Sequence, residues 1–269
     1  MSSDSESARL TNAVSFLDRI CTSRILPFRF VAVPKCGSTY LKGIASRMDG
    51  DCSKHQQSGI NKEYKCASAS ELGLSIADLR SEAKTFVVIR DPIHRFYSMY
   101  RDIFQGLGDN NVRSLRNTLL LEFGLNINAV SAEEHLANCW IFCQWLVDNM
   151  ARKDVSPFDK VWVPIHTLSR GMWELNIQIF LLDKLDEQLS FVFRNDEMLS
   201  KFFNDPVARD GRGGSPGRKE VIDEKLDRQL RDLYFDDMML FDVCAKLWRN
   251  AESKKHLESV PRFEDFLSS

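Results

Sequence analysis

The chain has 269 residues, 43% of them apolar, so it can bury a substantial core and is neither fibrous nor disordered. Its 36 lysines and arginines against 38 aspartates and glutamates give a formal net charge of −2. No overall positive field therefore favours a nucleic acid partner, and an anionic ligand must be held by a local cluster. The longest apolar run, Cys139 to Cys143, is far shorter than the roughly 20 residues that span a bilayer.

The first eight residues are rich in serine and acidic residues and lack the basic start and apolar stretch of a secretory signal. We therefore expect a cytoplasmic protein without a membrane span. Seven cysteines are scattered without a CxxC pair, which indicates reduced thiols and no disulfide framework. Cys139 and Cys143 have the spacing of one helix face, and we interpret them as packing residues, so we expect no metal site.

The first half of the chain contains two strand, loop, helix units. Apolar residues at helical spacing predict a helix from Ser7 to Ile20 that ends before Pro27. The apolar segment Phe28 to Val33 predicts a strand buried on both faces, and Thr39 to Met48 predicts the helix after the next loop. The second unit is a strand from Thr85 to Arg90, ended by Asp91-Pro92, with a helix from Ile93 to Phe104.

Further on, Ala132 to Met150 predicts an apolar helix, and Lys160 to Thr167 and Ile177 to Leu185 predict strands. Strands thus alternate with helices, which indicates an α/β fold with a central, mostly parallel sheet flanked by helices and ligands at the carboxyl ends of its strands. A charged amphipathic helical stretch follows over Glu220 to Asn250.

No segment has the composition of a linker, so we expect a single domain over residues 1–269. Two segments, Gly106 to Ser131 and Asn204 to Lys219, are predicted as long connections. Long loops in a compact domain are candidates for substrate gates.

A local cationic segment lies between Cys21 and Met48, which contains five basic residues and no acid. Within it, Lys35-Cys36-Gly37-Ser38-Thr39 falls between a predicted buried strand and a helix. Backbone N–H groups, a helix N-terminus and a lysine meet at such a loop, so it is predicted to bind phosphate or sulfate.

The loop does not match the sequence motifs of two common phosphate-binding sites. The nucleotide triphosphatase motif GxxxxGK[ST] requires a lysine after its second glycine, but Lys35 precedes Gly37. A cysteine phosphatase requires Cys-x5-Arg, but six positions after Cys36 stands Lys42, which cannot form the bidentate fork of an arginine.

The order Pro34-Lys35-Cys36-Gly37-Ser38-Thr39-Tyr40 resembles the 5′-phosphosulfate loop of sulfotransferases that use 3′-phosphoadenosine 5′-phosphosulfate. The segment Arg90-Asp91-Pro92, followed by Ser98 and Tyr100, resembles the 3′-phosphate motif of the same family, in its carbohydrate-type branch. The resemblance implies a sulfotransferase-like domain whose phosphosulfate loop is similar to a P-loop. It also implies donor binding by Lys35, Cys36, Gly37, Ser38, Thr39, Tyr40, Arg90 and Ser98.

The residue chemistry agrees with this resemblance. Arg90 at a strand end can form a fork with a phosphate, and Ser98 on the second turn of the next helix can add a hydroxyl. The alternative for Arg90 is a structural ion pair. We expect Asp91 to cap the helix, and His94 and Arg95 to lie on the solvated surface.

The family also has a late basic loop over the 3′-phosphate and adenine. Here that place is taken by a glycine-rich segment, from which we expect Arg212, Gly213, Gly214 and Arg218 to bind the nucleotide, although a flexible surface loop is the alternative. Tyr40 stands where the family commonly has an aromatic residue, and either contacts adenine or packs in the core.

Transfer to a hydroxyl needs positive charge at the leaving phosphate oxygen and a base for the acceptor proton. Lys35 supplies the charge. Some branches of the family carry a carboxylate about twenty residues past the loop lysine, and His55 at that offset is our first candidate for the base. Other branches place a histidine where this chain has Ser68, and Glu63 and Glu71 are the reserves.

The hypothesis is a sulfotransferase that moves a sulfuryl group from 3′-phosphoadenosine 5′-phosphosulfate to a hydroxyl or amine and leaves adenosine 3′,5′-bisphosphate. A small-molecule acceptor is preferred over a glycan. Two alternatives stay open: a non-catalytic protein that binds adenosine 3′,5′-bisphosphate, and a kinase-like phosphotransferase, which would require ATP and Mg²⁺.

Overall fold

The computed structural model describes most of the chain between Leu17 and Ser253. The described residues are 17–26, 28–50, 66–81, 85–106, 110–150, 163–165, 177–204 and 223–253. They divide into two compact units. Unit 1 draws on Met1–Ile89, Ser169–Gly213 and Asp242–Ser269, and unit 2 on Arg90–Leu168 and Gly214–Phe241. The single domain expected over residues 1–269 stays a prediction.

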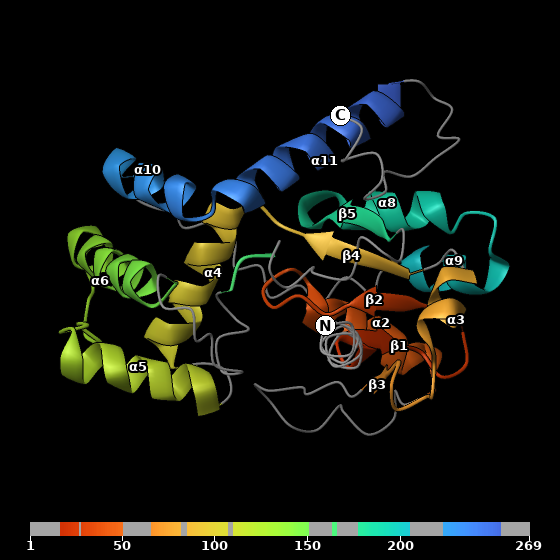
Figure 1. Cartoon of the computed structure of the whole chain (residues 1–269), viewed down its shortest axis with the longest axis horizontal. Coiled ribbons are helices and arrows are strands. Elements are labelled where there is room, and N and C mark those ends of the chain that lie inside the picture. The colour runs from red at the N-terminus through yellow and green to blue at the C-terminus, as the bar shows by residue number, and fades with distance from the viewer. Residues whose placement is uncertain are drawn as a thin grey trace, which may run out of the picture. The chain divides into compact units, whose positions relative to one another are not determined.

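Within its described residues, unit 1 contains a five-stranded open sheet with the strand order β3-β1-β2-β4-β5 (Figure 1). Its parallel ladders join β2 to β4 and β4 to β5, whereas β1 pairs antiparallel with both β2 and β3. All strands except β1 therefore run in one direction, which confirms the mostly parallel sheet. The strands are β1 (Ile20–Thr22), β2 (Arg29–Val31), β3 (Ala67–Ser68), β4 (Thr85–Ile89) and β5 (Gln178–Leu181).

The central strands are buried because their residues are apolar on both faces. All five residues of β4 are buried, as a parallel strand with helices over both faces requires. Phe86 of β4 packs against neighbouring rings, with centroids 5.3 Å from Phe28 and 4.9 Å from Phe180. Trp248 contacts Phe180 and donates its indole N–H to the carbonyl oxygen of Ile179 at 2.8 Å. The sheet is thus held by aromatic packing between neighbouring strands.

The sheet is flanked by helices (Figure 1). Helix α2 follows β2, and α8 follows β5 after the single 3₁₀ turn η4. Unit 1 contains α2 (Ser38–Met48), α3 (Ile76–Ser81), η4 (Leu182–Lys184), α8 (Leu185–Val192), α9 (Glu197–Asn204) and the larger part of α11 (Phe235–Ser253).

Unit 2 is helical in its described residues and has its own apolar core. Phe96 and Phe142 stack there with ring centroids 5.1 Å apart, and Cys139 and Cys143 are buried among them, as packing residues would be. Leu226 and Leu230 add the apolar side of an otherwise charged helix. The helices are α4 (Pro92–Gln105), α5 (Asn110–Glu122), α6 (Ala132–Met150), α10 (Glu224–Leu233) and the start of α11.

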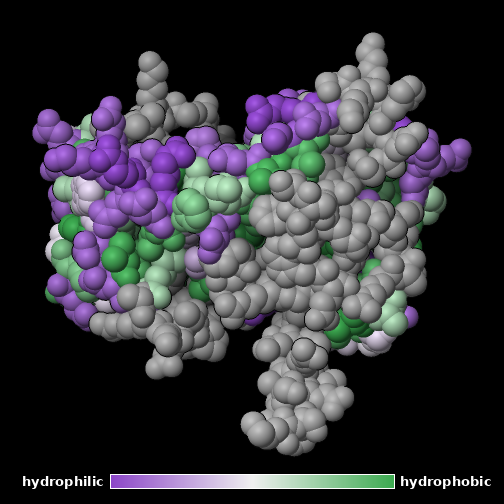
Figure 2. All heavy atoms as spheres, turned by 45° about the horizontal axis from the view of Figure 1, so that its top comes forward, coloured by the Kyte–Doolittle hydropathy of each residue, from purple (hydrophilic) through white to green (hydrophobic). Residues whose placement is uncertain are grey.

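The solvent side of α10 is strongly polar. In the space-filling view, hydrophilic residues gather over the region that α10 occupies in Figure 1 (Figure 2). Asp223 caps this helix by accepting N–H groups from Lys225 at 2.8 Å and Leu226 at 3.1 Å, and these bonds lower the pKa of its carboxyl. Where the sequence predicted one helical stretch over Glu220 to Asn250, the structure has two helices, α10 and α11. They meet at the buried Tyr234.

Two segments differ from the sequence-based expectation. Ile20, expected as the end of the helix from Ser7, begins strand β1, because pairing with β2 overrides the helical spacing of the apolar residues before it. The connection predicted from Gly106 to Ser131 contains helix α5, whose Val112, Leu115 and Leu119 are buried in the core of unit 2. The helix begins with two asparagines, which have low helix propensity, so the helical signal in the sequence is weak there.

Other predictions hold in part. The helices expected at Thr39–Met48, Ile93–Phe104 and Ala132–Met150 are present, as are the strands that begin near Phe28 and Thr85. The strand expected over Ile177–Leu185 ends at Leu181. Of the strand expected at Lys160–Thr167, the described residues 163–165 contain no strand, and the rest lies outside the described residues. The predicted connection Asn204 to Lys219 lies outside them too, apart from the last residue of α9.

Candidate functional site

The loop between β2 and α2 has an unusual backbone. Lys35 has φ of 65° and Gly37 has φ of 80°, so left-handed residues stand on both sides of the buried Cys36. The N–H group of Cys36 donates to the carbonyl oxygen of Val33 at 3.2 Å, which closes the turn after the strand. Alternation of this kind turns successive backbone N–H groups toward one side and is typical of anion-binding loops.

A side chain at Gly37 would be strained in this loop. A Cβ atom there would lie 2.7 Å from Cδ1 of Leu182, and its positive φ is a conformation that L residues rarely adopt. Leu182 comes from η4, directly after β5. The glycine thus allows the loop to lie close to the end of β5.

The N-terminus of α2 is suited to an anion. Gly37 is its N-cap and provides no side-chain bond to the first turn, which also lacks an acidic residue. The first intrahelical bond runs from the Leu41 N–H to the Gly37 carbonyl oxygen at 3.0 Å, so Ser38 and Thr39 precede it. Lys35 and Ser38 are half-buried, and Thr39 is exposed. The helix dipole and the lysine charge therefore favour a negative group at this point.

Tyr40 on the first turn of α2 has a fixed hydroxyl. Its O–H donates to Oδ1 of Asp186 on α8 at 3.0 Å, and its ring is half-buried. Asp186 was not found by sequence reasoning, because it is 146 positions away and has no local signal. Contact between Tyr40 and adenine stays a prediction, now for a ring whose position is anchored at its hydroxyl end.

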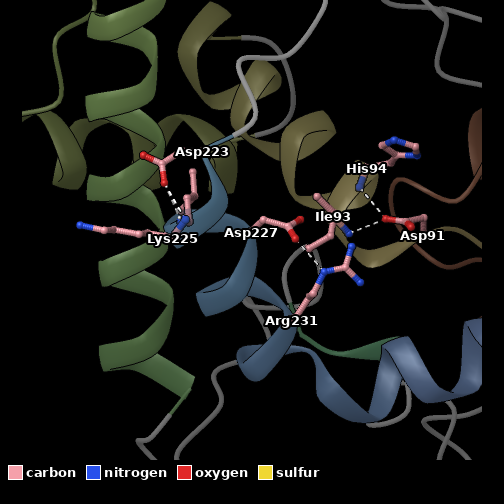
Figure 3. A network of polar contacts seen from close by, with 8 residues as sticks. Asp91, Ile93, His94, Asp223, Lys225, Asp227 and Arg231 are labelled. Carbon is pink, nitrogen blue, oxygen red and sulfur yellow. Dashed lines mark hydrogen bonds and ion pairs between the residues drawn. The ribbon is translucent and has the colours of Figure 1, made fainter.

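The second motif has the local structure predicted for it. Arg90 follows Ile89, the last residue of β4, and is half-buried. Asp91 caps α4, as expected, by accepting the N–H groups of Ile93 at 2.8 Å and His94 at 3.0 Å (Figure 3). Ser98 lies half-buried on the second turn of α4.

Arg95 corrects the expectation of a solvated surface residue. Only 1% of it is exposed, whereas its neighbour His94 is exposed as predicted. The Arg95 Nη1 group donates to the carbonyl oxygen of Val163 at 3.0 Å and lies 4.0 Å from Oδ2 of Asp237, itself fully buried. The same Asp237 oxygen accepts the Ile165 N–H at 2.6 Å. Helix α4, which carries Ser98, thus also carries one partner of a buried ion pair, and each partner of this pair hydrogen-bonds a backbone group.

Strands β2 and β4 of unit 1 end at the same edge of the sheet. β2 and β4 are neighbouring parallel strands, with Phe30 opposite Phe86 and Val31 opposite Val87. Their carboxyl ends therefore lie at the same edge, and the loop with Lys35 follows one strand while Arg90 follows the other. This is the edge at which open α/β sheets bind their ligands.

The candidates for a base are described only in part. His55 and Glu63 lie outside the described residues, as do Arg212, Gly213, Gly214 and Arg218 of the late loop. Glu71 is exposed and accepts the Ser68 N–H at 2.8 Å, so its carboxylate has a role in a turn. Among the other histidines, His135 is half-buried and shares a 2.8 Å hydrogen bond with the Tyr100 hydroxyl.

In the part of the chain that the structure describes, no group of three or more metal-ligating side chains could hold a metal ion. No helix there has the length and apolar character needed to cross a membrane.

Comparison with known proteins places these features in a family. The sulfotransferase family model matches residues 19–242 of the chain, which include the loop with Lys35, the segment from Arg90 to Ser98 and all five strands. No curated protein and no solved structure matches.

Proposed function

This chain belongs to the sulfotransferase family, and we propose that it moves a sulfuryl group from 3′-phosphoadenosine 5′-phosphosulfate to a hydroxyl or amine of a small molecule or glycan. The product of the donor is adenosine 3′,5′-bisphosphate. One observation carries this proposal: the left-handed Lys35 and Gly37 lie directly before a helix N-terminus that no side chain caps. This arrangement fits a doubly anionic phosphosulfate group.

In this proposal the loop binds the reacting end of the donor. Backbone N–H groups of Gly37, Ser38 and Thr39 and the positive end of the α2 dipole hold the phosphosulfate oxygens. The bond between sulfur and the bridging phosphate oxygen breaks, and a bond from sulfur to the acceptor atom forms. The ammonium group of Lys35 offsets the negative charge that develops on the leaving phosphate oxygen.

The remaining donor contacts follow from the second motif and the late loop. The Arg90 guanidinium holds the 3′-phosphate through a bidentate fork, and the Ser98 hydroxyl donates to the same group. The local structure supports the assignment, because Arg90 follows the end of β4 and Ser98 lies on the second turn of the capped helix α4. We also assign nucleotide binding to Arg212, Gly213, Gly214 and Arg218.

The acceptor proton needs a base. We assign this role to His55, which takes the proton of a hydroxyl as the new bond to sulfur forms. An amine acceptor that is already unprotonated needs this help less. Glu71 is the weaker reserve because its carboxylate accepts a backbone N–H, and Glu63 stays a reserve.

The experiment is a transfer assay with donor labelled in its sulfuryl group, run against a panel of hydroxyl and amine acceptors in buffer with a chelator. The proposal expects label on at least one acceptor and equimolar adenosine 3′,5′-bisphosphate. Binding of adenosine 3′,5′-bisphosphate without transfer to any acceptor would favour the non-catalytic alternative. Transfer from ATP that requires Mg²⁺ would favour the kinase-like alternative, and either result contradicts the proposal.

A further inference from the structure

Two cysteine side chains meet on one face of the sheet, at its antiparallel edge. In the ladder between β1 and β3, Cys21 stands opposite Ser68 and Thr22 opposite Ala67. One more step along this register brings Cys66 level with Ser23. Since side chains alternate between faces, Cys21 and Cys66 share a face as diagonal neighbours, within reach of each other. A hydrogen bond joins the two thiols, and this diagonal position allows it.

The surroundings of the pair distinguish the two sulfur atoms. Cys21 is 8% exposed, and Cys66 is half-buried, so solvent reaches the pair from the side of Cys66. The hydrogen bond from Cys66 lowers the pKa of Cys21, and Lys42 of α2 lowers it further, whereas burial and Glu71 act in the opposite direction. The same hydrogen bond raises the pKa of Cys66. The hydrogen bond from Cys66 thus favours the thiolate form of Cys21 over that of Cys66.

We propose that Cys21 and Cys66 form a dithiol that peroxides oxidise to a disulfide within the chain. The Cys21 thiolate attacks a peroxide oxygen, the O–O bond breaks, and Cys21 becomes a sulfenic acid. Cys66 then attacks this sulfur through its own thiolate, the S–O bond breaks, and water leaves. In balance, two thiols lose two electrons and two protons, and hydrogen peroxide is reduced to two molecules of water.

The position of this disulfide along the chain gives it a consequence for the site. The segment between Cys21 and Cys66 contains β2, the loop with Lys35 and Gly37, and α2. Oxidation therefore closes a covalent loop that contains the strand, loop and helix to which we assign phosphosulfate binding. The disulfide also lowers the conformational entropy of the unfolded chain. The proposal itself needs only the two thiols and a peroxide, so it stands or fails independently of the proposed enzymatic activity.

The test is mass spectrometry of the full chain treated with hydrogen peroxide and digested with trypsin without reductant. Cleavage after Arg19, Arg24, Lys65 and Arg80 puts the two cysteines in separate peptides, 20–24 and 66–80. We expect these peptides as one linked species that a reductant separates. Absence of this species, or linkage of either cysteine to another one such as Cys52, would overturn the proposal.

Alkylation rates give a second readout with a matched control in the same sample. Burial raises the pKa of Cys143 to about 11. Because the hydrogen bond from Cys66 lowers the pKa of Cys21, we expect Cys21 to be alkylated several-fold faster than Cys143. Equal rates for Cys21 and Cys143 would refute the assignment of the thiolate.

Three variants test the order in which the two cysteines react. Cys66→Ser should stop the reaction at a sulfenic acid on Cys21, which a dimedone-type reagent traps. Cys21→Ser should leave Cys66 largely unoxidised, and Lys42→Met should slow oxidation several-fold. Circular dichroism checks that each variant is folded. A folded Cys21→Ser variant in which Cys66 is oxidised at the rate of the unchanged chain would contradict the proposed order.

Discussion

Replacing Asp237 with alanine removes the carboxylate that faces the buried guanidinium of Arg95. Arg95 is 1% exposed, and the side chain of Asp237 is fully buried, so water cannot replace the lost partner. The N–H group of Ile165 also loses its acceptor, now 2.6 Å away. Both effects act in the same direction and destabilise unit 2.

The distances set the size of the effect. Unit charges 4.0 Å apart attract each other by about 4 kcal/mol at the effective dielectric constant of roughly 20 that suits protein sites. Removing one partner of a buried pair typically costs about 3–5 kcal/mol, because the other charge remains buried. We expect this loss for Asp237→Ala and a similar loss for Arg95→Met, which leaves the Val163 carbonyl oxygen without its donor at 3.0 Å.

A double variant distinguishes the contribution of the ion pair to stability from that of side-chain packing. Arg95→Met combined with Asp237→Leu removes both charges of the pair, so its loss should be smaller than the sum of the single losses by about 2–3 kcal/mol. Urea unfolding measures the free energies, and hydrogen exchange of α4 and α6 amides assigns them to unit 2. Single losses under about 1 kcal/mol, or losses that add within about 0.5 kcal/mol, would refute this reasoning.

Three further predictions concern the proposed site. Gly37→Ala places a methyl group 2.7 Å from a leucine carbon and should lower donor affinity more than tenfold. Gly50 is the control, because its φ is also positive but nothing lies within 4 Å of an added Cβ. Gly50→Ala should lose only about 1–2 kcal/mol of stability. Equal donor affinity in both variants would contradict the role of the close contact. Arg90→Ala and Ser98→Ala should weaken adenosine 3′,5′-bisphosphate far more than adenosine 5′-phosphosulfate in calorimetry, because only the former has a 3′-phosphate, and equal losses would make these residues structural. His55→Ala should lower turnover on a hydroxyl acceptor by roughly 10² to 10⁴ with unchanged nucleotide binding, and near-normal turnover would move the base elsewhere.

Local patterns were sufficient to predict the elements that carry the two motifs. The apolar segment from Phe28 ends at Pro34, and Asp91-Pro92 ends the strand from Thr85, so both strand ends were visible in the sequence. The Asp91 cap followed from its position before a proline at the start of a helix. Each of these signals depends on residues within a few positions of one another.

Long-range contacts could not be predicted in this way. Leu182 determines that Gly37 has no side chain, and nothing near either residue indicates the contact. Arg95 looks like a surface residue beside His94, and its burial depends on Asp237, which is distant in the sequence. Strand β1 is too short to identify by pattern, since its three residues become a strand through pairing with β2. In each case the structure depends on a contact between residues that are distant in the sequence.

The most direct test of the central claim is the rate of sulfuryl transfer by Lys35→Ala under single-turnover conditions. Lys201→Ala is the matched control, because it removes an exposed lysine from α9. Loss of one preorganised donor at the leaving oxygen is worth roughly 3 to 4 kcal/mol, so we expect transfer to fall about 10²- to 10³-fold in Lys35→Ala and to be unchanged in Lys201→Ala. A folded Lys35→Ala variant that transfers within tenfold of the unchanged chain would contradict the assignment of the loop between β2 and α2.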